Sequence, residues 1–208
     1  MSGVGGIPSR QIRATFSSST VTVYQAFPSA IARPALIAQR FVPPFKMSRM
    51  TWIKPSFLWM MYRSGWATKE NQEVILAIQI SRTGFEWALE NSALTDYDKH
   101  VYRDRREWEE RKKATPVRVQ WDPERSLALT PQPWRSIQVG LSREAVNLYV
   151  HDWISEIVDI TPMVRKAHSL VIADRQDLAR TIIPEEEPYA IPGRIKKIIG
   201  ATDQDSLV

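Results

Sequence analysis

The chain has 208 residues, of which 43% are hydrophobic and 25% charged, and its formal net charge is +5. It contains no cysteine, which excludes disulfides, thiolate catalysis and cysteine-based metal sites. The basic balance favours phosphate-bearing partners only weakly, because acidic residues are also numerous. The N-terminus lacks a signal-peptide core and no apolar run approaches transmembrane length, so we expect a cytoplasmic protein without membrane contact.

The length suits one domain with short flanking ends. Residues 1–10 are rich in Gly and Ser and are expected to be flexible. Residues 11–190 are expected to form a single globular domain, and residues 191–208 a loosely ordered C-terminal tail.

Strands and helices alternate in the first half of this domain. STVTVYQAF (19–27) has the β-branched and aromatic residues of a strand, and Ser29 can start a helix that Pro34 disturbs. EVILAIQIS (73–81) predicts the clearest strand of the chain. Its first residues are apolar without alternation, which indicates burial on both faces.

The run RMTWIKPSFLWMMYRSGW (49–66) mixes aromatic, methionine and basic residues. MTWIK predicts a strand that Pro55 ends, because strand interiors seldom tolerate proline. Ser56 is a suitable N-cap for the following helix, and Gly65 a suitable end. The run therefore divides into a helix that packs into the core and a strand end that faces a cleft.

The second half of the chain continues with both kinds of element. The predicted elements are a helix over 84–94, a charged helix or excursion over 96–114, strands over 116–124 and 135–142, and helices over 142–160 and 161–183. Together with the first half, this order predicts an α+β fold.

Polar side chains stand at strand ends in three places. They are Tyr24 and Gln25, then Trp52, Lys54 and Ser56, and finally Gln120, Asp122, Glu124, Arg135 and Gln138. Each has a plain structural interpretation; Asp122 before Pro123, for example, is a common way to start a turn. Binding groups nevertheless gather where strands end in turns, so we predict one cleft. The three histidines are widely separated, and no metal site is expected.

The runs IRATF, VTVYQAF, RMTWIKPSFLWMMYRSGW, VILAIQISRTGFEWAL, VRVQWDPERS and RSIQVGL together resemble the domain of unknown function 4291 family over roughly residues 13–189. That resemblance implies no activity. The opening order of elements is also remotely similar to the first half of ADP-ribosyltransferases. This second resemblance implies a central split or mixed β-sheet flanked by helices, and NAD as a substrate.

In ADP-ribosyltransferases the first strand offers His or Arg, the second Ser, Thr or Tyr, and a late strand Glu. The resemblance therefore implies catalytic roles for Gln25 and for Glu124 or Gln138. It implies NAD-binding roles for Arg13, Tyr24, Arg49, Trp52, Lys54 and Ser56. Tyr24 and Trp52 would sandwich the nicotinamide ring, and the acceptor would be a nucleic acid, a nucleotide or a protein.

Two other functions stay open on the sequence. Aromatic residues next to Lys and Arg suit a non-catalytic nucleic-acid-binding module. An exposed Trp/Met patch would suit an interaction protein. Whether the protein is an enzyme and what its oligomeric state is are not indicated.

Overall fold

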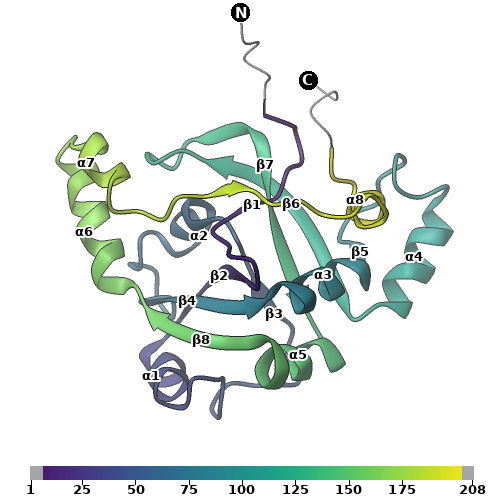
Figure 1. The fold of residues 1–208 in the computed structure, drawn as a ribbon, viewed down its shortest axis with the longest axis horizontal. Coiled ribbons are helices and arrows are strands. Elements are labelled where there is room, and N and C mark those ends of the chain that lie inside the picture. Colours follow the sequence, from purple (N-terminus) through teal and green to yellow (C-terminus); the bar gives the residue numbers. More distant parts are fainter. Residues whose placement is uncertain (1–6, 203–208) are drawn as a thin grey trace, which may run out of the picture.

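The computed structural model describes residues 7–202, which form one α+β domain (Figure 1). A three-stranded antiparallel sheet has the order β2-β4-β8. Its strands are β2 (Thr20–Phe27), β4 (Val74–Ser81) and β8 (Ile154–Asp159). The central strand β4 pairs with β2 along its whole length, and none of its residues is exposed. Ile75 packs into one core cluster and Leu76, Ile78 and Ile80 into another, so both faces of the strand contact the core, which explains its apolar sequence.

A four-stranded mixed sheet has the order β3-β7-β6-β5. Its strands are β3 (Thr51–Ile53), β5 (Ser92–Leu94), β6 (Val117–Arg125) and β7 (Pro131–Leu141). Strand β7 begins at Pro131, ahead of the strand that the sequence predicts over 135–142. Pro131 and Pro133 are accommodated there because β3 pairs only with the last three residues of β7, so the proline half of β7 is an edge.

The two sheets meet at a seam between β2 and β3. A single bridge joins them, in which the Tyr24 N–H donates to the Lys54 carbonyl oxygen at 2.7 Å. Since β2 and β3 share only this bridge within residues 7–202, the sheet is split at this point.

Helices cover both sheets, and Figure 1 shows α6 and α7 at one end of the molecule and α4 and α8 at the other. The helices are α1 (Ser29–Ala38), α2 (Phe57–Ser64), α3 (Arg82–Glu90), α4 (Arg105–Ala114), α5 (Glu144–Leu148), α6 (Thr161–Ile172), α7 (Gln176–Arg180) and α8 (Gly193–Ile199). The predicted start of α2 is confirmed, because the Ser56 hydroxyl oxygen accepts from the Trp59 N–H at 3.1 Å. Gly65 ends α2 with a φ of 59°, as predicted.

The single helix predicted over 142–160 is wrong. Helix α5 passes into a π-helical turn, η1 (Tyr149–Trp153), and the chain then extends as β8. The apolar spacing is helical only as far as Trp153. After it, the free edge of β4 provides a strand partner for the β-branched residues of Ile154–Asp159, and tertiary pairing overrides the helical pattern.

The C-terminal segment was expected to be a loose tail from residue 191, but it contains helix α8. Ile195 and Ile199 are buried, and the Trp121 indole donates to the Ile199 carbonyl oxygen at 2.7 Å. Before this helix, β9 (Glu187–Pro188) pairs with β1 (Arg13–Ala14). Two buried isoleucines in a seven-residue helix give too short a pattern to predict from sequence.

The flexible N-terminus predicted for residues 1–10 lies partly outside the described residues, which begin at residue 7. Within them, the Ser9 carbonyl oxygen accepts from the Arg135 N–H at 2.8 Å, which holds this end against β7. None of the helices within residues 7–202 is long and apolar enough to span a lipid bilayer.

Candidate functional site

A cleft of about 560 Å³ opens at the seam between the two sheets, and we name it the Lys54 cleft. Its size lies in the range of sites that hold small ligands. The residues that line it come from both sheets, from α2 and from the loop after α2: Gln25, Ala26, Phe27, Met50, Thr51, Trp52, Lys54, Met60, Arg63, Glu70, Asn71, Gln72, Gln120 and Gln138.

Lys54 follows β3 and is almost fully buried, with 7% of its surface exposed. Its ammonium donates to the Trp52 carbonyl oxygen at 3.1 Å and lies 5.5 Å from the centre of the Trp59 ring. Burial lowers the pKa of Lys54 to about 7, and the charge of Arg63 acts in the same direction, while Asp122 opposes the shift. Lys54 can therefore be a cation or a neutral base near pH 7.

Gln25 borders the cleft but is engaged within the protein. Its amide nitrogen donates to Thr51 Oγ1 at 2.7 Å and to the Trp52 carbonyl oxygen at 3.0 Å. Its amide oxygen accepts from the Tyr149 hydroxyl at 2.8 Å. These bonds make Gln25 a brace between β2, β3 and η1, and they leave it little capacity to bind a ligand.

Trp52 forms a partly exposed aromatic wall of the cleft, and Gly140 of β7 makes room for it. A Cβ atom at Gly140 would lie 2.9 Å from Cη2 and Cζ2 of the indole, closer than carbon atoms can approach. Gly140 thus leaves the space that the indole ring occupies.

Three polar side chains of the β6–β7 hairpin form a bonded group beside Lys54. Asp122 Oδ1 accepts from Gln120 Nε2 at 2.9 Å, and Asp122 Oδ2 accepts from Gln138 Nε2 at 2.6 Å. From the sequence, Asp122 belongs to the polar residues at strand ends, but the resemblance assigns it no catalytic or binding role. The available signal was its alternation with Gln120, which places both side chains on one face of β6.

Four other predicted residues, Arg13, Tyr24, Ser56 and Glu124, do not line the cleft. Tyr24 and Gln25 are neighbours on one strand, so their side chains point to opposite faces. The Tyr24 ring is buried and packs edge-on against Phe57, with ring centres 5.6 Å apart. The prediction that Tyr24 stacks on a nicotinamide ring is therefore wrong in this structure.

Ser56 and Glu124 lie at the start of α2, together with a second buried carboxyl group, that of Glu186. The Ser56 hydroxyl donates to Glu124 Oε1 at 2.9 Å, and the Phe57 N–H donates to Glu186 Oε1 at 2.6 Å. Burial raises the pKa of Glu124, and burial together with the charge of Glu124 raises the pKa of Glu186 to about 8. Arg13 donates to the backbone oxygen of Glu186 at 2.9 Å. The sequence offered no strand or motif that would have marked Glu186.

Arg49 is exposed and lines a smaller groove of about 210 Å³. The groove is lined by Phe27, Ile31, Pro44, Phe45, Lys46, Arg49, Met50 and Thr51. Since Phe27, Met50 and Thr51 also line the Lys54 cleft, the two hollows adjoin.

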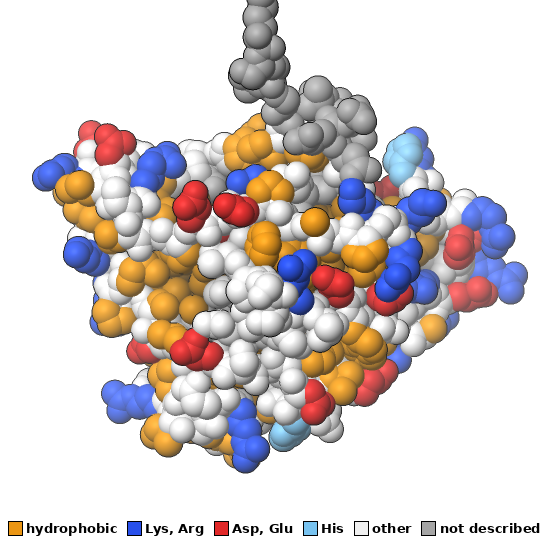
Figure 2. Space-filling model, viewed as in Figure 1, with side chains coloured by type: hydrophobic (Ala, Val, Ile, Leu, Met, Phe, Trp, Pro, Cys, Tyr) orange, Lys and Arg blue, Asp and Glu red, His pale blue; other side chains and the backbone are white. Residues whose placement is uncertain are grey.

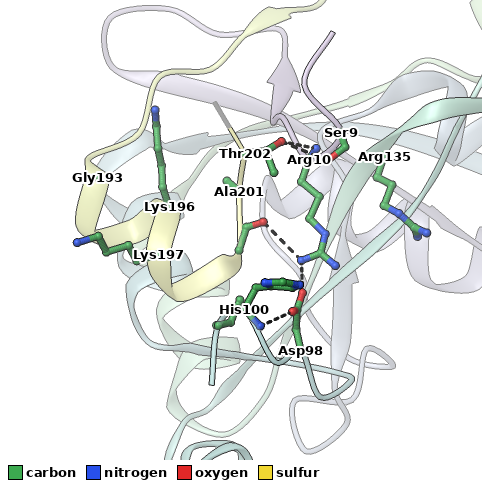
Figure 3. A pocket seen from close by; sticks show the side chains of 12 residues that line it. Ser9, Arg10, Asp98, His100, Arg135, Gly193, Lys196, Lys197, Ala201 and Thr202 are labelled. Atoms are coloured by element: carbon green, nitrogen blue, oxygen red, sulfur yellow. Dashed lines mark hydrogen bonds and ion pairs between the residues drawn. The ribbon is translucent and has the colours of Figure 1, made fainter. Parts of the chain in front are cut away.

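A larger hollow of about 900 Å³ lies between α8, the N-terminal segment and β7, and we name it the basic groove (Figure 3). Its charged or titratable lining residues are Arg10, Asp98, His100, Arg135, Lys196 and Lys197. Asp98 forms an ion pair with Arg10 at 2.6 Å. In Figure 2, Lys and Arg side chains gather over α8 and α4, with acidic side chains among them.

The structure thus brings Gln25, Trp52, Lys54 and Gln138 to one cleft and places the other five predicted residues elsewhere. Within residues 7–202, no three His, Asp or Glu side chains gather closely enough to hold a metal ion.

No curated protein matches this sequence. Residues 11–189 match a family model described as a domain of unknown function, DUF4291. Because the match extends over most of the chain, the protein belongs to the DUF4291 family.

Proposed function

We propose that the protein is an ADP-ribosyltransferase-like enzyme that binds NAD in the Lys54 cleft. One observation carries the proposal: the end of β2 at Gln25, the end of β3 at Lys54, and Gln138 on the late strand β7 meet at one cleft. The resemblance assigns functional residues to these three strands. The split between the two sheets agrees with the fold that the resemblance implies.

The lining residues suit the parts of NAD. Trp52 offers a flat wall for the nicotinamide ring. Arg63 of the cleft can neutralise the pyrophosphate, and Arg49 lies in the adjoining groove, where the ligand would continue.

In the proposed reaction the bond between ribose C1′ and the nicotinamide nitrogen breaks, and the nitrogen keeps the electron pair. A nucleophilic oxygen or nitrogen of the acceptor forms the new bond to C1′ and loses its proton. Neutral Lys54 can accept this proton, because its pKa of about 7 leaves a large fraction unprotonated at neutral pH. Asp122, beside Gln138, supplies negative charge near the positive centre that develops on the ribose.

The test is release of nicotinamide from NAD, followed by chromatography, with the protein alone and with RNA, DNA or cell proteins as acceptors. We expect release with the wild type and a loss of at least 100-fold with Lys54→Met. Lys113→Met, a matched change at an exposed lysine of α4, should retain activity. No release and no transfer of label from NAD by folded protein with any acceptor would refute the proposal.

The basic groove supports a second candidate, a non-catalytic nucleic-acid-binding module. Arg10, Arg135, Lys196 and Lys197 line it with one carboxylate, Asp98, among them. Cations spaced along an open groove suit a phosphodiester backbone. This candidate predicts binding of a labelled single-stranded RNA that weakens steeply with salt and is weakened further by Lys197→Ala. Binding that does not change between 50 and 200 mM salt, roughly the range over which phosphate contacts are lost, would contradict it.

A further inference from the structure

Gln120 and Gln138 are direct neighbours across the β6–β7 hairpin. They are paired in the strand register, so their side chains leave the sheet on the same face. Directly opposed residues have Cβ atoms about 4.5–5.5 Å apart. Both glutamines line the Lys54 cleft.

One carboxylate fixes the orientation of both amides. Asp122 uses Oδ1 for the Nε2 of Gln120 and Oδ2 for the Nε2 of Gln138, at 2.9 and 2.6 Å. An ionised carboxylate can only accept hydrogen bonds, so each amide must turn its NH2 group to Asp122. The two carbonyl oxygens are thereby turned away from Asp122.

These two amide oxygens are available to a ligand. Within residues 7–202, no N–H or O–H group donates to Oε1 of Gln120 or of Gln138, although the amide nitrogens are engaged. The cleft thus holds two adjacent acceptors whose direction is set by a third residue. A ligand that matches them must carry two neighbouring donors.

We infer that Gln120 and Gln138 bind the vicinal 2′- and 3′-hydroxyl groups of a ribose, and that Asp122 positions them to do so. The cis-diol of a ribose places two O–H donors on adjacent carbon atoms, as the paired oxygens require. The surrounding residues fit the rest of a ribonucleotide: Trp52 offers a wall for a base, and Arg63 lines the cleft for phosphate.

This inference rests on the proposed function only in placing a nucleotide in the Lys54 cleft. It adds that the cleft selects ribose over deoxyribose. A deoxyribonucleotide would leave one amide oxygen without a donor, and an unpaired polar group in a bound complex costs affinity.

The test is calorimetric titration of the protein with AMP, 2′-deoxy-AMP and 3′-deoxy-AMP. We expect AMP to bind at least 10-fold more tightly than either deoxy analogue. Gln120→Met and Gln138→Met keep side-chain length but remove one acceptor each. Each variant should reduce the preference over one of the two deoxy analogues to about 2-fold or less and keep the preference over the other. Gln132→Met, on the same hairpin and outside the cleft, should leave the preference unchanged.

Asp122→Asn tests the positioning role separately. Asparagine offers one acceptor oxygen, so it cannot hold both amides as the carboxylate does. The ratio of AMP to deoxy-AMP affinity should fall even where the melting temperature is unchanged. A purely structural role for Asp122 would change stability and leave that ratio intact.

Several outcomes would overturn the inference: equal affinities for AMP and its deoxy analogues, an unchanged preference in both methionine variants, or no binding of any of these nucleotides to folded protein. The failure of the proposed function is distinguishable. A preference for ribose without nicotinamide release would refute the enzyme and support the diol site. Nicotinamide release at equal rates from NAD and from its deoxyribose analogues would support the enzyme and refute the diol site.

Discussion

Glu186 accepts a 2.6 Å hydrogen bond from the backbone N–H of Phe57, the first residue of α2. The bond joins the C-terminal segment to the end of a helix that also borders the Lys54 cleft. A carboxylate at a helix N-terminus is normally favourable. Here burial and the neighbouring Glu124 raise the pKa of Glu186 to about 8, so the group is largely protonated at neutral pH.

Glu186→Gln should stabilise the protein in a pH-dependent way. Its folded pKa of about 8 exceeds the usual value of 4.5, so the folded state binds more protons than the unfolded state between these values, and the wild type loses stability as pH rises through this window. Glutamine keeps the acceptor oxygen and has no such loss. We expect a gain of about 1–3 kcal/mol at pH 8 and none at pH 4.5 in urea unfolding. Glu187→Gln, at the exposed neighbour, is the control.

Lys54→Met should show the complementary pH dependence. The folded pKa of about 7 lies below the ordinary 10.5, so the unfolded state binds more protons in this window and wild-type stability rises with pH across it. The cost of burying the ammonium is therefore complete below pH 7 and absent above about pH 10.5. We expect the variant to melt several degrees higher than the wild type at pH 6 and to lose this advantage by pH 10. A constant difference would mean that packing, not charge, causes it.

Asp122→Asn should reduce NAD turnover much more than Glu124→Gln. Asp122 is bonded to two residues of the cleft, whereas Glu124 is buried beside Ser56 at the start of α2. We expect kcat/KM to fall at least 30-fold for Asp122→Asn and less than 3-fold for Glu124→Gln, both measured by nicotinamide release. Loss of turnover in Glu124→Gln, with its fold intact, would mean that Glu124 and not Asp122 supplies the catalytic carboxylate.

Gly84→Ala should destabilise the protein strongly. A Cβ at this position of α3 would lie 2.4 Å from Cγ of Trp153, a buried ring that cannot move freely. Overpacking of this kind costs about 1–3 kcal/mol. Gly193→Ala is the matched control because nothing lies within 4 Å of its added Cβ. Thermal unfolding of the two variants should separate them clearly, and equal melting temperatures would contradict the tight packing of α3 on η1.

The sequence predicts those parts of the site that depend only on neighbouring residues in the chain. Pro55, Ser56 and Gly65 act on their own neighbours, so the turn and the limits of α2 could be derived without knowledge of the fold. Trp52 and Lys54 were assigned to a cleft because they alternate on one strand. These two assignments agree with the lining of the Lys54 cleft.

The remaining features depend on contacts between distant segments. The π-helical turn and β8 replaced a predicted helix because β4 offered an edge. The resemblance implies a catalytic role for Gln25, but the amide of Gln25 is hydrogen-bonded to Thr51 and Tyr149, which the sequence does not show to be close. The role of Asp122 depends on Gln138 lying opposite Gln120, which is a property of the hairpin register and not of either strand alone.

The two ends of the described chain are joined: the Thr202 N–H donates to the Arg10 carbonyl oxygen at 2.9 Å, and β9 pairs with β1. These contacts close a loop of nearly the whole domain, and loop-closure entropy makes contacts of such separation late to form. A nascent chain cannot complete β1, α8 or the basic groove until residues 187–202 have emerged from the ribosome. All residues that line the Lys54 cleft are synthesised before this segment, but Tyr149 and Glu186, which hold Gln25 and α2 in place, follow them.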